Sequence, residues 1–167
     1  MTVYQYCTPE WLEESARRYT ADPRFEKEFA GITQKSSKYV FRVKAEPAWG
    51  IETDLLFGAV VEKGKLLHLG FFNEQDARKD VSFILSATPQ EWKRLLRKES
   101  KFISVVMLKK VVVETGDFAG LLKIAPHGDA FVDALTQVTL QFPDEMTPDE
   151  LAKYKSHLQA FRKKQGV

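Results

Sequence analysis

The sequence predicts an α+β fold with a five-stranded, mixed and largely antiparallel sheet covered by helices. Two observations predict this class. The apolar period changes from helical spacing to alternation near residue 38, and it returns to helical spacing after residue 115. Between these points three strand-like segments follow one another, and two more are separated by a helical insertion. This order differs from the regular alternation of strand and helix in a doubly wound parallel fold.

Three predicted helix starts share the dipeptide Thr-Pro, at Thr8, Thr88 and Thr147. Threonine caps free N–H groups of a first turn, and proline suits the first helical position. Glu91 and Glu150 stand three residues after their threonines and predict capping boxes. We therefore expect helices over residues 9–19, 23–31, 89–98 and 148–167.

Alternating side chains predict the strands. Tyr39, Phe41 and Val43 share one face of their segment, opposite Arg42. Two later strands are joined by a tight turn at residues 62–64, whose glycine tolerates a positive φ. The predicted strands are 38–45, 54–61, 65–71, 81–87 and 109–115.

The segment 102–108 has apolar residues at helical spacing and predicts a short buried helix, although its β-branched residues would also suit a strand. Further helices are expected over 118–125 and 127–138. We expect residues 1–140 to form one domain. Residues 141–167 are expected to form a connection and an amphipathic helix, as an appendage rather than a second domain.

The composition limits the function classes. The chain has 167 residues, 44% hydrophobic and 29% charged, as in an ordinary globular domain. Its 25 basic and 23 acidic residues argue against a nucleic-acid-binding protein. A single cysteine excludes a disulfide framework, and no run approaches the about 20 apolar residues of a membrane span. We expect a cytoplasmic protein.

No catalytic, phosphate-binding, dinucleotide-binding or metal-binding motif is present, so no cofactor and no metal are expected. His68 lies in a predicted strand and is a candidate acid or base if it faces a cavity with Asp54 or Asp80. His127 and His157 are predicted to be surface residues. Cys7 is expected to be an inert thiol.

The apolar residues are unusually widespread. The strand residues 55–61 and 111–113 are apolar on both faces, and the covering helices also carry large side chains. Trp92, Leu95 and Leu96 lie on one face of their helix, with basic residues turned away. Such elements build either a filled core or the wall of an apolar cavity, and composition does not distinguish the two.

Several features occur in a characteristic order between Tyr39 and Val138. They are the Gly64-Lys65 turn, Asp80, the Trp-x-x-Leu-Leu helix at 92–96, the Gly116-Asp117 pair that ends the last strand, and Leu121-Leu122 in the following helix; Trp49-Gly50 precedes the second strand. In this order the chain resembles the lipid-binding domain of the sterol carrier protein type 2 family. It departs from the family at Lys109-Lys110, where Gly-Lys is usual, and in lacking a terminal Ser-Lys-Leu, so a peroxisomal location is not expected.

The resemblance implies that the helices and sheet enclose an apolar tunnel, which binds a fatty acid, fatty acyl-CoA, sterol or isoprenoid without chemistry. The residues it assigns to the tunnel wall are Phe83, Leu85, Trp92, Leu95, Leu96, Phe102, Val106, Val113, Phe118, Leu121, Leu122 and Leu135. Lys93, Arg94 and Arg97 are the head-group candidates. The expected partners are a lipid or another apolar small molecule and at most a transient membrane contact, with no nucleic acid.

Two other hypotheses remain. An interaction or dimerisation module would have a filled core and an apolar surface patch. A small-molecule enzyme would use His68 inside the cavity, which a solvent-facing His68 would contradict.

Overall fold

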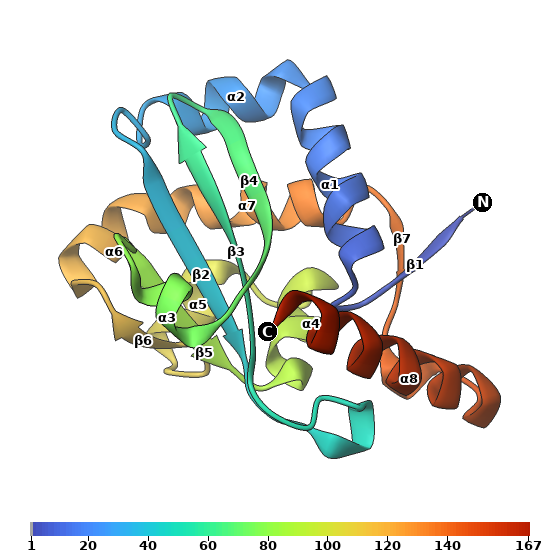
Figure 1. Ribbon diagram of the computed structural model, residues 1–167. Coiled ribbons are helices and arrows are strands. Elements are labelled where there is room, and N and C mark those ends of the chain that lie inside the picture. The colour runs from blue at the N-terminus through green and yellow to red at the C-terminus, as the bar shows by residue number, and fades with distance from the viewer. Residues whose placement is uncertain (1) are drawn as a thin grey trace.

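The computed structural model describes residues 2–167 and contains a five-stranded sheet (Figure 1). Its strands are β2 (Ser37–Val43), β3 (Leu55–Glu62), β4 (Lys65–Phe72), β5 (Phe83–Ala87) and β6 (Val112–Thr115). Their order is β4-β3-β2-β5-β6, in which β2 and β5 are parallel and the other neighbours are antiparallel. The predicted α+β class and the mixed, largely antiparallel sheet are confirmed.

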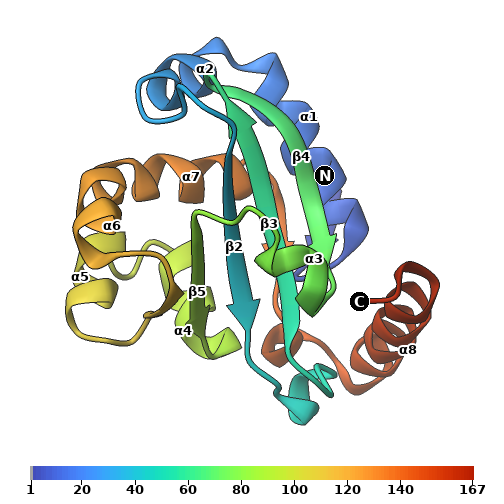
Figure 2. The same cartoon turned by 60° about the vertical axis from the view of Figure 1, so that its left-hand side comes forward.

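Helices form a layer on one face of this sheet. They are α1 (Pro9–Ala21), α2 (Pro23–Ala30), α4 (Pro89–Leu96), α5 (Phe102–Met107), α6 (Phe118–Ile124) and α7 (Gly128–Leu135). Figures 1 and 2 show α7 passing behind the strands and the short helix α3 (Glu74–Arg78) in front of them. The last helix, α8 (Pro148–Gln165), lies beyond one end of the sheet (Figure 1).

The predicted helix starts are confirmed by their caps. The Thr8 hydroxyl accepts from the N–H of Trp11, and the Thr147 hydroxyl accepts from the N–H of Glu150. Glu150 completes the predicted capping box at α8. At α4 the Thr88 hydroxyl accepts from the Glu91 N–H, but the carboxylate of Glu91 lies 3.4 Å from Arg94 and does not return the bond.

Some elements have no local sequence signal. The strands β1 (Val3–Gln5) and β7 (Thr139–Gln141) form a separate two-stranded parallel sheet. Each strand has three residues, too few to show an alternation of apolar and polar side chains. The two strands pair only because the rest of the fold brings the ends of the chain together. The single-turn helices η1 (Pro47–Trp49), η2 (Ala125–His127) and η3 (Pro143–Glu145) and helix α3 were also not predicted. The segment 102–108 is helical, as its spacing predicted.

Helix α8 packs on the same core as the rest of the chain. Tyr154, Leu158 and Phe161 are buried in it, and the Tyr154 hydroxyl donates to the carbonyl of Tyr6. Arg162 donates to the carbonyls of Thr53 and Asp54. The division of the chain at residue 140 stays a prediction, and these contacts bind the two parts together.

The face of the sheet opposite the helix layer carries a buried cation. The Arg42 side chain is only 9% exposed, and its guanidinium lies 2.6 Å from Glu74, 2.8 Å from Glu114 and 3.4 Å from Asp54. The hydrogen bond from Arg42 lowers the pKa of Glu74 below its ordinary value, although burial opposes this shift. One arginine therefore joins β2, β6, helix α3 and the residue before β3.

Replacing Arg42 with methionine is expected to lower the free energy of unfolding at neutral pH by about 1–2 kcal/mol, because three partly exposed carboxylates lose their shared cation. Because the folded-state pKa of Glu74 is lowered, its contribution is complete above the ordinary glutamate pKa and is lost as the pH falls through the lowered value. Urea unfolding of both proteins at pH 7 and in acid checks this. An Arg42→Met cost that is equally large in acid would contradict it.

Candidate functional site

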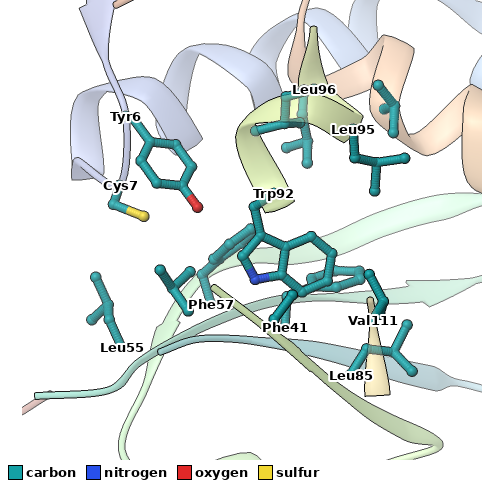
Figure 3. Packing of buried hydrophobic residues seen from close by; sticks show 14 of the residues in the cluster. Tyr6, Cys7, Phe41, Leu55, Phe57, Leu85, Trp92, Leu95, Leu96 and Val111 are labelled. Atoms are coloured by element: carbon teal, nitrogen blue, oxygen red, sulfur yellow. The ribbon is translucent and has the colours of Figure 1, made fainter. Parts of the chain in front are cut away.

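The inward faces of three strands and of the helix layer converge on one apolar space. Phe41, Phe57 and Leu85 point from neighbouring strands toward the helix layer, because their strands alternate in the same register. Figure 3 shows Trp92 above Phe41 and Phe57, with Leu95 and Leu96 from the next turn of α4. The Trp92 and Phe41 rings meet edge to face, with centroids 5.7 Å apart.

A cavity remains between these layers. Its wall comes from α1, α2, β2, β3, β5, α4, α5, α6, η2 and α7, and is almost entirely apolar. The atom-free space between the walls, open mouth included, is about 870 Å³, but the cavity itself has a volume of only about 70 Å³. The space is therefore narrow, and aromatic side chains fill much of its width.

The structure places seven of the twelve predicted wall residues on this cavity. They are Phe83, Leu85, Trp92, Leu95, Leu96, Phe102 and Leu135. They come from four elements, so tertiary packing brings together residues that lie far apart in the sequence. Whether they contact a lipid stays a prediction.

The other five predicted wall residues lie elsewhere. Val106 and Leu121 are buried in the core outside the cavity, and Val113 on the edge strand β6 is half-buried. Phe118 and Leu122 are corrected most clearly, since they are 49% and 42% exposed. Helix α6 has only seven residues, and Leu121 alone is its buried contact with the core.

Sequence reasoning missed a further part of the wall. It includes Tyr19, Phe29, Ile32, Tyr39, Ile124, His127, Phe131 and Val132. The alternation of Tyr39 with Phe41 was a usable signal in the sequence. Tyr19 of α1 and Phe29 of α2 had no such signal, because only the docking of these helices on the sheet brings the two residues to the cavity.

The polar side chains on the cavity wall are few. The Trp92 indole N–H donates to the carbonyl of Arg42 at 2.9 Å, and the Tyr19 hydroxyl donates to the carbonyl of Gly64 at 2.7 Å. Burial raises the pKa of Tyr19, so this phenol stays neutral. Nδ1 of His127 lies 2.9 Å from a carboxylate oxygen of Glu28. His127, predicted as a surface residue, instead borders the cavity with a side chain 28% exposed.

The structure separates His68 from the cavity. His68 pairs with Val60 on the sheet face opposite the helix layer, is exposed, and packs edge to face on Phe72. Partial burial and the nearby Lys38 lower its pKa. Asp54 binds Arg42 and the N–H of Ala45 instead. The hypothesis of an enzyme with His68 inside the cavity is therefore wrong.

The described chain offers neither a metal site nor an exposed thiol. Residues 2–167 contain no group of three or more histidine, cysteine, aspartate or glutamate side chains that could hold a metal ion. The Cys7 thiol is fully buried, and burial raises its pKa to about 12. No helix in the same range is both long and apolar enough to cross a membrane.

Two of the three head-group candidates are engaged within the protein. Lys93 lies 2.9 Å from Asp144, and Arg97 lies 2.7 Å from Glu145. Arg97 also donates to the carbonyl of Leu140 at 3.0 Å. The sequence interpretation is corrected here: these cations hold the connection before α8, and its carboxylates were not expected as partners. Arg94 is 54% exposed and makes only a 3.4 Å contact within its own helix.

Comparison with solved structures identifies the fold. A crystal structure of sterol carrier protein 2 aligns with a TM-score of 0.68 at 16% identity, covering 80% of this chain and 98% of that one. A conserved hypothetical protein of Thermus thermophilus, assigned provisionally to the sterol carrier proteins, aligns with a TM-score of 0.68 at 15% identity, covering 81% and 90%. The apo form of sterol carrier protein 2 from Yarrowia lipolytica aligns with a TM-score of 0.50 at 16% identity, covering 74% and 88%.

The resemblance predicted from the sequence is confirmed as a likeness of fold. No protein-family model matches the chain, and no curated protein matches its sequence. The chain therefore has the sterol carrier protein 2 fold, and its site must be judged on its own residues.

Arg97→Ala is expected to lower the free energy of unfolding by about 1 kcal/mol, because it removes bonds to Glu145 and the Leu140 carbonyl. Arg94→Ala is the matched control on the same helix, and it is expected to change that energy by less than about 0.5 kcal/mol. Urea unfolding measures both variants. Equal losses would contradict a special role for Arg97.

Proposed function

We propose that the chain binds a single-chain lipid, foremost a fatty acid, in the cavity between the sheet and the helix layer, without catalysing a reaction on it. The observation that carries the proposal is the almost wholly apolar wall. Transfer of an acyl chain from water is favourable by about 0.8 kcal/mol per buried CH₂, so such a ligand needs few polar contacts. A fatty acyl-CoA or a sterol offers the same apolar surface, and the wall alone does not select among them.

The fold gives this proposal independent support. The solved structures of the same fold are named as sterol carrier proteins, although their identity to this chain is only 15–16%. The Trp92 and Tyr19 polar groups on the wall already have partners in the protein. These two groups are therefore not free to react with a ligand, and most of the wall offers it apolar contact alone.

The narrow space requires the walls to separate when a lipid enters. Small-molecule sites usually enclose about 300–1,000 Å³, and the space between these walls reaches that range only with its open mouth included. Short helices α5 and α6, with six and seven residues, form the least anchored part of the wall. We expect this part to move outward in the loaded protein.

The polar end of the lipid is proposed to lie at His127. His127 lines the cavity and carries a basic side chain, whereas Lys93 and Arg97 are bound to acidic residues of the C-terminal connection. Glu28 accepts from Nδ1 of His127, so Nε2 is the ring nitrogen proposed to meet the ligand. An imidazole that donates from both ring nitrogens binds Glu28 with one and a fatty-acid carboxylate with the other.

The first experiment is native mass spectrometry of the purified protein, followed by extraction of bound lipid. We expect a near-stoichiometric acyl lipid, or tight binding of a fluorescent fatty acid to the empty protein. An empty protein that also fails to bind the fluorescent fatty acid would contradict the proposal and favour an interaction module with a filled core.

Enlarging a wall residue is expected to block binding. Val132→Phe adds bulk to the narrow cavity and should weaken fatty-acid binding by about tenfold or more, at a stability cost of about 1–3 kcal/mol. Val106→Phe is the matched control, because Val106 is as deeply buried but lies outside the cavity. Fluorescence titration of both variants, with circular dichroism to verify folding, makes the comparison. Equal weakening would contradict a cavity site.

His127→Gln is expected to weaken fatty-acid binding by about fivefold while leaving the affinity for the methyl ester unchanged, because only the acid has a carboxylate to bind. His157→Gln is the control. His157 also lies 3.0 Å from a glutamate, Glu10, but it is on α8 away from the cavity. Competition with the fluorescent ligand measures both, and equal effects on acid and ester would refute the assignment of His127.

A further inference from the structure

A cluster of exposed apolar side chains lies outside the cavity. Eight large apolar residues among residues 2–167 are exposed, and six of them fall between positions 103 and 122. These six are Ile103, Met107, Leu108, Val112, Phe118 and Leu122, with 37% to 67% of each residue exposed. Figures 1 and 2 both show α5 beside α6 at one corner of the molecule, and Figure 1 shows β6 next to them. We call these six residues the corner patch.

Four lysines lie in or directly beside the segment of the chain that carries the corner patch. Lys101, Lys109, Lys110 and Lys123 are exposed, and none of them forms an ion pair within the described chain. The acidic residues of the same segment are already engaged. Glu114 binds Arg42, and Asp117 accepts from the N–H of Gly120 as the cap of α6. Residues 101–123 thus combine exposed apolar side chains with exposed lysines.

The elements that carry the patch also form the cavity wall. In α5, Phe102 lines the cavity while the next residue, Ile103, is exposed. In α6, Ile124 lines the cavity and Leu122 is exposed. One layer of helix therefore separates the cavity from the outer surface, which is also apolar. An ordinary surface helix has a polar outer face, and α5 and α6 do not.

We infer that the corner patch docks on the surface of an anionic lipid bilayer. Exposed Leu, Met and Phe side chains enter the interfacial region of a bilayer, and each nearby lysine adds about 1 kcal/mol of attraction to anionic head groups. A second copy of this chain is a less favourable partner for the patch, because the positively charged lysines of the two copies would face each other. The docking itself does not require the cavity to hold lipid.

The experiment measures binding of the full chain to vesicles by flotation. We expect binding to mixed phosphatidylcholine and phosphatidylglycerol vesicles, weaker binding to pure phosphatidylcholine, and release at high salt. Leu108→Asp with Phe118→Asp should weaken binding to the mixed vesicles by about tenfold or more. Leu67→Asp is the matched control, because Leu67 is 58% exposed on the opposite edge strand β4.

A second variant tests the charge. Lys110→Glu with Lys123→Glu should also weaken binding by about tenfold or more, and Lys65→Glu on β4 should not. Lys109 is left unchanged because its φ of 58° makes substitutions there harder to interpret. The inference would be overturned if wild-type protein failed to bind the mixed vesicles, or if the patch variants bound them as tightly as wild type. A wild-type dimer that the patch variant converts to a monomer in light scattering would also overturn it.

The outcome is separable from that of the proposed function. Native mass spectrometry of the Leu108→Asp, Phe118→Asp variant should still show a lipid-loaded protein, because neither residue lines the cavity. Loss of vesicle binding with retained lipid is the expected result. Wild-type protein that binds the mixed vesicles but carries no lipid and takes up no fluorescent fatty acid would instead refute lipid binding and leave the docking surface intact.

Discussion

The Trp92 indole holds the helix layer against the sheet, and much of the molecule depends on this contact. Its N–H donates to the main-chain carbonyl of Arg42, while its ring packs edge to face on Phe41. The side chain of Arg42 extends from the opposite face of β2 and forms ion pairs there with Glu74 and Glu114. One strand thus anchors a cavity-wall helix on one face and an ion cluster on the other. A shift of β2 would disturb both.

The helix layer is not equally anchored along its length. Helix α4 is fixed by Trp92 and by the bonds of Lys93 and Arg97 to the C-terminal connection. Helices α5 and α6 are short and have no comparable polar contacts within the described chain, apart from the Phe102 N–H that donates to Asp129. The firm part of the cavity wall therefore lies at α4, and the part able to yield lies at the corner patch.

The sequence predicted what local periodicity encodes. The five strands, the capped helices and most wall residues of β5 and α4 follow from spacing and from the resemblance. It did not predict the pairing of β1 with β7, nor the ion pairs of Arg97, because both join residues that lie far apart along the chain. Phe118 and Leu122 show the other limit. From sequence alone, an apolar residue in a predicted helix is assigned to the core. Only the structure shows that these two residues face outward.

The exposed apolar residues account for part of the high apolar content of the chain. An ordinary covering helix needs one apolar face, but α5, its C-cap Leu108 and α6 expose Met107, Leu108 and Phe118 at a cost in solubility. A filled core does not explain these exposed residues, because helices with polar outer faces would cover such a core equally well. The exposed residues are consistent with a cavity whose thinnest wall meets an apolar phase, because a lipid chain can then leave one apolar environment for another without crossing water.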